Sequence, residues 1–156
     1  MFTAALVFMQ RPSFLKPAPK PVFLCLKFET PMFQNDYFTE SELACRCCGK
    51  NHFKDETLKR LIRVRERFGK PMIINSGYRC PAHNARLNAT MTHTTGQAVD
   101  VQVALGRAYR LIQIAQEEGF TGIGVKQKGP IGKRFLHLDD LESIPGERTR
   151  PTVWSY

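Results

Sequence analysis

Apolar positions recur every three or four residues in two stretches of the chain. The first, residues 55–69, starts with two acidic side chains and ends at Gly69. The second, residues 106–119, also ends in a glycine, Gly119. Acidic residues in a first turn and glycine after a last turn are typical of helix ends, so both stretches are predicted to be helices.

Short apolar or alternating runs predict strands around these helices. Residues 98–103 alternate apolar and polar positions, as a half-buried strand does. The predicted strands are residues 72–74, 98–103, 122–125 and 135–138. A long loop, residues 76–96, separates the first two, with a helical turn expected after Pro81. A loop of this length in a small domain is usually functional.

The order of these elements predicts the fold class. Helices come first, followed by strands with one helix between them. This order favours an α+β fold in a single domain, with a small, largely antiparallel sheet and flanking helices. Thr39 and Glu42 have the spacing of a capping box and are expected to open a short helix near the start of the folded unit.

Composition sets the expected domain boundaries. Five prolines interrupt residues 1–35, which we interpret as an irregular extension, with Met32 as a candidate true start. The folded unit is expected over residues 36–145, followed by a tail over residues 146–156. No apolar run approaches the roughly 20 residues that span a bilayer, so no membrane span is expected.

The chain of 156 residues carries a formal net charge of +9. Such a charge suits nucleic acid, an anionic membrane surface or an anionic wall polymer. The basic residues crowd into residues 54–70, which fits either the solvated face of a helix or a contact with an anionic polymer. We find no zinc-finger spacing and no RNA-recognition signature, and we therefore expect no nucleic-acid partner.

Three side chains are candidate metal ligands. His93 lies on the long loop, Asp100 in the strand that follows it, and His137 in the last predicted strand. An ionised Asp within an apolar strand is costly unless it is paired or bound to a metal. Two nitrogens and one oxygen suit catalytic zinc, which keeps a fourth position open for water. The alternative is a hydrogen-bonded histidine and a turn-capping aspartate.

Three motifs together resemble the zinc D-Ala-D-Ala carboxypeptidase family, and in particular its short single-domain members from bacteria and phages. They are SGYR at residues 76–79, HTTGQAVD at residues 93–100 and HLD at residues 137–139. The resemblance extends over residues 37–139. It implies an α+β fold, one zinc ion on the three candidate ligands, and cleavage of peptidoglycan stem peptides at the bacterial cell wall or periplasm. We expect a monomer.

The resemblance also implies that Arg79 lies near the zinc and contacts the substrate. A guanidinium can form a forked pair with a peptide carboxylate or stabilise a developing oxyanion. The alternative is a structural salt bridge that holds the loop. Ser76 is expected to shape the substrate-binding loop, and Asn84 to brace it through backbone hydrogen bonds.

The general base departs from the pattern of related wall peptidases. They often carry a carboxylate or a histidine two or three residues before the last zinc histidine, where this chain has Phe135 and Arg134. Asp139 lies two residues after His137, and a strand would place both on one face. Asp139 is therefore a candidate catalytic base, or alternatively a partner that orients a ligand.

The cysteines form an irregular set. They are Cys25, Cys45, Cys47, Cys48 and Cys80. An odd, bunched set is a poor match to a disulfide framework and favours synthesis in a reducing compartment. With His52 and His83, the last four could form a second zinc site. The spacing is not a clean pair of CxxC motifs, however, and free buried cysteines are common, so we expect one zinc ion per chain.

Two functions remain open at this stage. The first is a zinc metallopeptidase, acting as a carboxypeptidase if Arg79 grips a terminal carboxylate and as an endopeptidase if the groove is open beyond it. The second is a non-catalytic zinc-containing module that binds cell wall or belongs to a phage particle.

Overall fold

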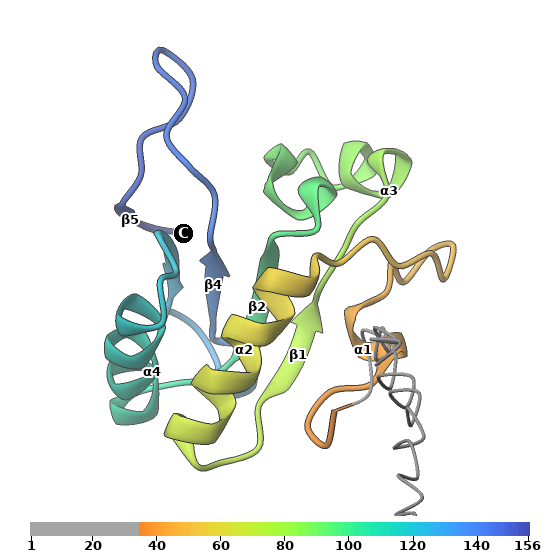
Figure 1. Cartoon of the computed structure of the whole chain (residues 1–156). Coiled ribbons are helices and arrows are strands. Elements are labelled where there is room, and N and C mark those ends of the chain that lie inside the picture. The colour runs from red at the N-terminus through yellow and green to blue at the C-terminus, as the bar shows by residue number, and fades with distance from the viewer. Residues whose placement is uncertain (1–34) are drawn as a thin grey trace, which may run out of the picture. The chain divides into compact units, whose positions relative to one another are not determined.

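The computed structural model describes residues 35–156 (Figure 1). The helices are α1 (Glu40–Leu43), α2 (Asp55–Phe68), α3 (Pro81–Arg86) and α4 (Gly106–Glu117), with 3₁₀ helices η1 (Met91–Thr95) and η2 (Ile131–Lys133). The strands are β1 (Ile73–Ser76), β2 (Ala98–Gln102), β3 (Gly122–Lys126), β4 (Phe135–Asp139) and β5 (Thr152–Ser155). Apart from Asn35, the expected N-terminal extension and its candidate start at Met32 lie outside these residues.

The five strands form one sheet in the order β1-β2-β4-β3-β5. The pairs β1–β2, β2–β4 and β4–β3 are antiparallel, and only the pair β3–β5 is parallel. The predicted α+β class is confirmed. The predicted helices correspond to α2 and α4, and the predicted strands to β1 to β4, with β1 beginning one residue later than expected.

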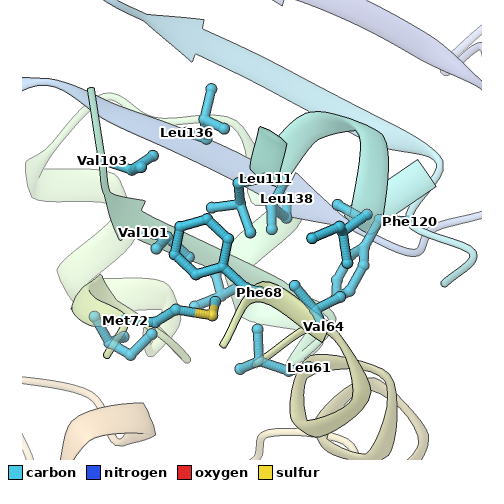
Figure 2. Packing of buried hydrophobic residues seen from close by; sticks show 14 of the residues in the cluster. Leu61, Val64, Phe68, Met72, Val101, Val103, Leu111, Phe120, Leu136 and Leu138 are labelled. Carbon is cyan, nitrogen blue, oxygen red and sulfur yellow. The ribbon is translucent and has the colours of Figure 1, made fainter. Parts of the chain in front are cut away.

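The hydrophobic core lies between one face of the sheet and the helices α2 and α4 (Figures 1 and 2). Leu136 and Leu138 of β4, Leu111 of α4 and Val64 of α2 all belong to this core and are fully buried. Successive side chains of a strand point to opposite faces. The residue between the two leucines, His137, therefore points to the other face of the sheet.

The predicted long loop contains regular structure. The helical turn expected after Pro81 is α3, and η1 follows it. η1 ends at Gly96, whose φ of +77° is left-handed and whose hypothetical Cβ would overlap the carbonyl oxygen of His52. Glycine is therefore required at this position on both conformational and steric grounds. The turn delivers the chain directly into β2.

Strand β5 lies within residues 146–156, the segment predicted to be a tail. It pairs in register with β3, from Gly122 opposite Thr152 to Val125 opposite Ser155. This pairing brings Arg150 and Trp154 back to the centre of the sheet, where each contacts a residue of β4. Within residues 35–156, no helix is long and apolar enough to cross a bilayer.

Candidate metal centre

The three predicted ligands converge from three elements. His93 comes from η1, while Asp100 of β2 and His137 of β4 are directly opposite each other in the sheet register. His93 Nε2 lies 3.2 Å from Asp100 Oδ1 and 3.1 Å from His137 Nδ1, and these last two atoms are 3.0 Å apart. The exposed fractions are 2%, 6% and 2%.

This arrangement fits a zinc ion. Tetrahedral ligands at bonds of about 2.0–2.1 Å lie roughly 3.3 Å from one another. The three donor atoms here are separated by nearly that distance and share one centre. Two nitrogens and one oxygen are a ligand set of catalytic zinc, which leaves one coordination position for water or substrate.

Each imidazole is oriented through its other ring nitrogen. His93 Nδ1 donates to the carbonyl of Gly77 at 2.7 Å, and His137 Nε2 donates to Asp139 Oδ2 at 3.1 Å. These bonds leave His93 Nε2 and His137 Nδ1 free to accept a metal. A Cβ on Gly77 would lie 2.5 Å from the carbonyl oxygen of Leu43, which explains the glycine of the SGYR motif.

Asp139 lies on the far side of the His137 ring from the other ligands. It is fully buried, and Arg150 donates to both of its oxygens at 2.8 Å. Burial raises the pKa of this carboxyl, but the hydrogen bonds from His137 and Arg150 outweigh burial and lower its pKa to about 2. Asp139 is therefore ionised at neutral pH, and both of its oxygens accept hydrogen bonds from Arg150.

The surroundings shift the pKa of each of the three ligands. Burial lowers the pKa of His93, whereas for His137 burial is outweighed by the polar contacts with Asp100 and Asp139, which raise its pKa. Burial opposes ionisation of Asp100, but its close polar contacts with His137 and His93 outweigh burial and hold the pKa of its carboxyl well below the usual range. A neutral imidazole and an ionised carboxylate are the metal-binding forms of these groups.

Arg79 lies directly beside this cluster. Its Nη2 donates to Asp100 Oδ2 at 2.5 Å, and its Nε donates to Ser76 Oγ at 2.8 Å. Asp100 Oδ1 thus faces the two histidines, and its Oδ2 accepts the hydrogen bond from Arg79. Asn84, as expected, bonds to backbone, donating to the carbonyl of Ala89 at 2.8 Å.

Sequence reasoning missed the contribution of the C-terminal segment. The ring of Trp154 lies 5.2 Å from the ring of His137, and Tyr156 lies 5.2 Å from Phe135. A Cβ on Gly124 would lie 2.8 Å from atoms of both Trp154 and Tyr156, so the glycine makes room for this aromatic pair. Alternating aromatics in residues 152–156 could have indicated a strand, but nothing in the sequence gives its place in the sheet.

The cysteine-rich segments form a second group. Cys45, Cys47, Cys48 and Cys80 come together, and His83 lies beside them. His52 does not join this group, since its ring packs edge-on against Tyr78 at 5.0 Å.

The sequence profile of the peptidase M15 family matches residues 36–139. The chain belongs to the peptidase M15 family. No curated protein matches the chain at a significant level. The M15 family consists of zinc metallopeptidases, and the cluster of His93, Asp100 and His137 is a ligand group that such a family requires. The match ends at Asp139, so it does not include Arg150 or β5.

Proposed function

We propose that this M15 protein hydrolyses peptide bonds in peptidoglycan stem peptides, with a catalytic zinc ion on His93, Asp100 and His137. One observation carries the proposal: three buried donor atoms from three elements lie within 3.2 Å of one another. Both imidazoles are also fixed in the tautomer that such a site requires. The three ordered motifs of the sequence support the substrate class.

Zinc bound at this centre would polarise the scissile carbonyl and lower the pKa of a bound water to about 7. The chain itself supplies the binding of the substrate. Arg79 is partly accessible at the cluster, where its guanidinium can pair with a substrate carboxylate or with negative charge developing on the carbonyl oxygen. Ser76 holds the Nε edge of Arg79 and so sets the direction of the fork.

We assign Asp139 the role of a positioning residue. A proton acceptor would have to face the open coordination position, whereas the Asp139 carboxylate contacts His137 Nε2, on the side of the ring away from Asp100. Arg150 also occupies both of its oxygens. A buried carboxylate in this place fixes the ring of a metal-binding histidine and raises its basicity.

Mass spectrometry of muropeptides, after incubation of purified cell wall with the zinc-loaded protein, tests the proposal. We expect new products, with release of free D-Ala for a carboxypeptidase and an internal cut for an endopeptidase. His93→Ala should abolish both, whereas His52→Ala, which removes a histidine outside the cluster, should retain activity. A zinc-loaded wild type that binds wall but yields no new product would refute the enzyme and favour the binding module.

A further inference from the structure

Four thiols from two distant segments meet at one point on the structure. Cys45, Cys47 and Cys48 lie on the turn after α1, and Cys80 is the residue before α3. All four sulfurs lie within 4.8 Å of one another. Cys47 Sγ is 3.7 Å from Cys45 Sγ and 3.4 Å from Cys80 Sγ.

These distances match metal coordination better than the alternatives. Four sulfurs around zinc at bonds of about 2.3 Å lie roughly 3.8 Å apart. A disulfide requires about 2.05 Å, and all four cysteines are free. Free cysteines usually cluster because they are buried among apolar side chains. That explanation fails here, since Cys47 and Cys48 are exposed.

The backbone is folded to present the sulfurs. The carbonyl of Cys45 accepts from the amides of Cys48 at 3.3 Å and Gly49 at 2.8 Å, and Gly49 has a left-handed φ of +69°. The amide of Cys45 donates to the carbonyl of Lys50 at 2.9 Å. These three bonds close a tight turn that places three thiols on one side.

Nitrogen donors surround the same sulfurs. The amide of Cys80 donates to Cys45 Sγ at 3.3 Å, and the amide of His83 donates to Cys80 Sγ at 3.4 Å. His83 Nδ1 lies 3.4 Å from Cys45 Sγ. Donors of this kind stabilise thiolate charge and orient sulfur ligands around a metal.

We propose that Cys45, Cys47, Cys48 and Cys80 bind a second, structural zinc ion, with His83 as a hydrogen-bond donor to Cys45. A closed set of four thiolates leaves no position for water, as is typical of structural sites. The protein then holds two zinc ions rather than the single ion expected from the sequence.

The position of this site indicates its structural role, which is to hold the segment that carries Arg79. Cys80 directly follows Arg79, and the amide of Tyr78 donates to the carbonyl of Leu43 at 2.8 Å. The ion shared by Cys80 and the turn after α1 would anchor one end of the short segment that carries Arg79, and the hydrogen bond of Tyr78 anchors the other end. Its effect on cleavage rests on the proposed function, whereas the presence of the ion does not.

Metal content of the purified, zinc-loaded protein is the first test. We expect two zinc ions per chain in the wild type, and one each in Cys47→Ser, Cys48→Ser and His137→Ala. Cys25→Ser, which removes the cysteine of the sequence that is not one of the four proposed ligands, is the matched control and should retain two. One ion in the wild type, still present in Cys47→Ser, would overturn the proposal.

Cobalt substitution tests the ligands without any cysteine variant. Cobalt bound to thiolates gives intense sulfur-to-metal charge-transfer absorption in the near ultraviolet, which a site of two histidines and an aspartate cannot give. We expect this absorption in the wild type and in His137→Ala, and its loss in Cys47→Ser. Its absence from the wild type, or an intact mass two hydrogens lighter that indicates a disulfide, would refute the site even if the protein cleaves cell wall.

Discussion

At the scale of residues, the site depends on a chain of contacts that runs outward from the ligands. His137 donates to Asp139, and Arg150 donates to both oxygens of Asp139. His137 and Asp139 are buried and the Arg150 side chain is only 8% exposed, so a lost hydrogen bond would leave a polar group unpaired and largely away from water. The position of His137 is therefore set from residue 150 as much as from its own strand.

Asp139→Asn provides a test of this chain of contacts. An amide carries no charge to balance Arg150 and polarises the imidazole less than a carboxylate does. Zinc affinity should fall about 10- to 100-fold, as measured by competition with a chromogenic chelator. Asp140→Asn is the matched control, because Asp140 bonds to Thr57 and Gln97 instead of a ligand, and it should keep the affinity of the wild type.

The same variant separates the two roles that the sequence left open for Asp139. A positioning residue lowers zinc affinity, and saturating zinc should restore much of the cleavage rate. Unchanged zinc affinity together with a lost cleavage rate would instead identify Asp139 as the proton acceptor.

The sequence alone was enough to select candidate metal ligands. An aspartate and a histidine in apolar strands are conspicuous because burying them is costly, so Asp100 and His137 could be selected without a structure. Arg150 could not be selected in this way, because an arginine in a polar stretch has no such cost. Only the pairing of β5 with β3 brings it to Asp139.

At the scale of elements, η1 and its terminal glycine set the approach of His93. Gly96 accepts a bond from the amide of Lys54 at 2.9 Å through its carbonyl, so the turn is fixed to the start of α2. The sequence identified Gly96 as part of a motif. It could not show that the carbonyl of His52 fills the space where a side chain would be.

Gly96→Ala should therefore destabilise the protein strongly. A left-handed backbone costs an alanine roughly 1–2 kcal/mol, and the clash with His52 adds to that cost. Gly129→Ala is the matched control, with a similar φ of +79° and nothing within 4 Å of its Cβ. Urea unfolding of both variants should show the larger loss for Gly96→Ala, and equal losses would show that the contact with His52 is unimportant.

The predicted helices were recovered because their pattern is long and periodic. Residues 152–155 form a strand of four residues at the edge of the sheet, and two of their side chains are exposed. Such a segment carries little periodicity to detect. Its structure is determined by the edge of β3, which is distant in sequence.

At the scale of the whole molecule, the basic side chains of residues 54–70 are less available to an anionic partner than the sequence suggests. Arg63 and Arg67 of α2 both pair with Glu118 at the end of α4, with the closest contacts at 2.7 Å and 2.8 Å. Arg60 donates to the carbonyl of Gly119. Part of the basic stretch over residues 54–70 therefore holds two helices together, and the chain as a whole carries a formal net charge of +9.

This charge should affect cleavage of intact wall more than cleavage of a short peptide. Cell-wall polymers are anionic, and attraction between exposed charges is screened over about 8–10 Å at physiological salt. Raising the salt concentration should raise KM for intact wall and leave KM for a soluble stem peptide nearly constant. Equal changes for both substrates would show that charge attraction does not contribute to wall binding.

The parallel pairing of β5 with β3 has a consequence for how the protein matures. During synthesis the three zinc ligands leave the ribosome before Arg150 does, and domains fold as their chain emerges. A nascent chain that ends before Arg150 holds His93, Asp100 and His137 but lacks the guanidinium that pairs with both oxygens of the buried Asp139 carboxylate. We expect such a chain to exchange zinc readily, and we expect zinc exchange to become slow only after β5 has been synthesised.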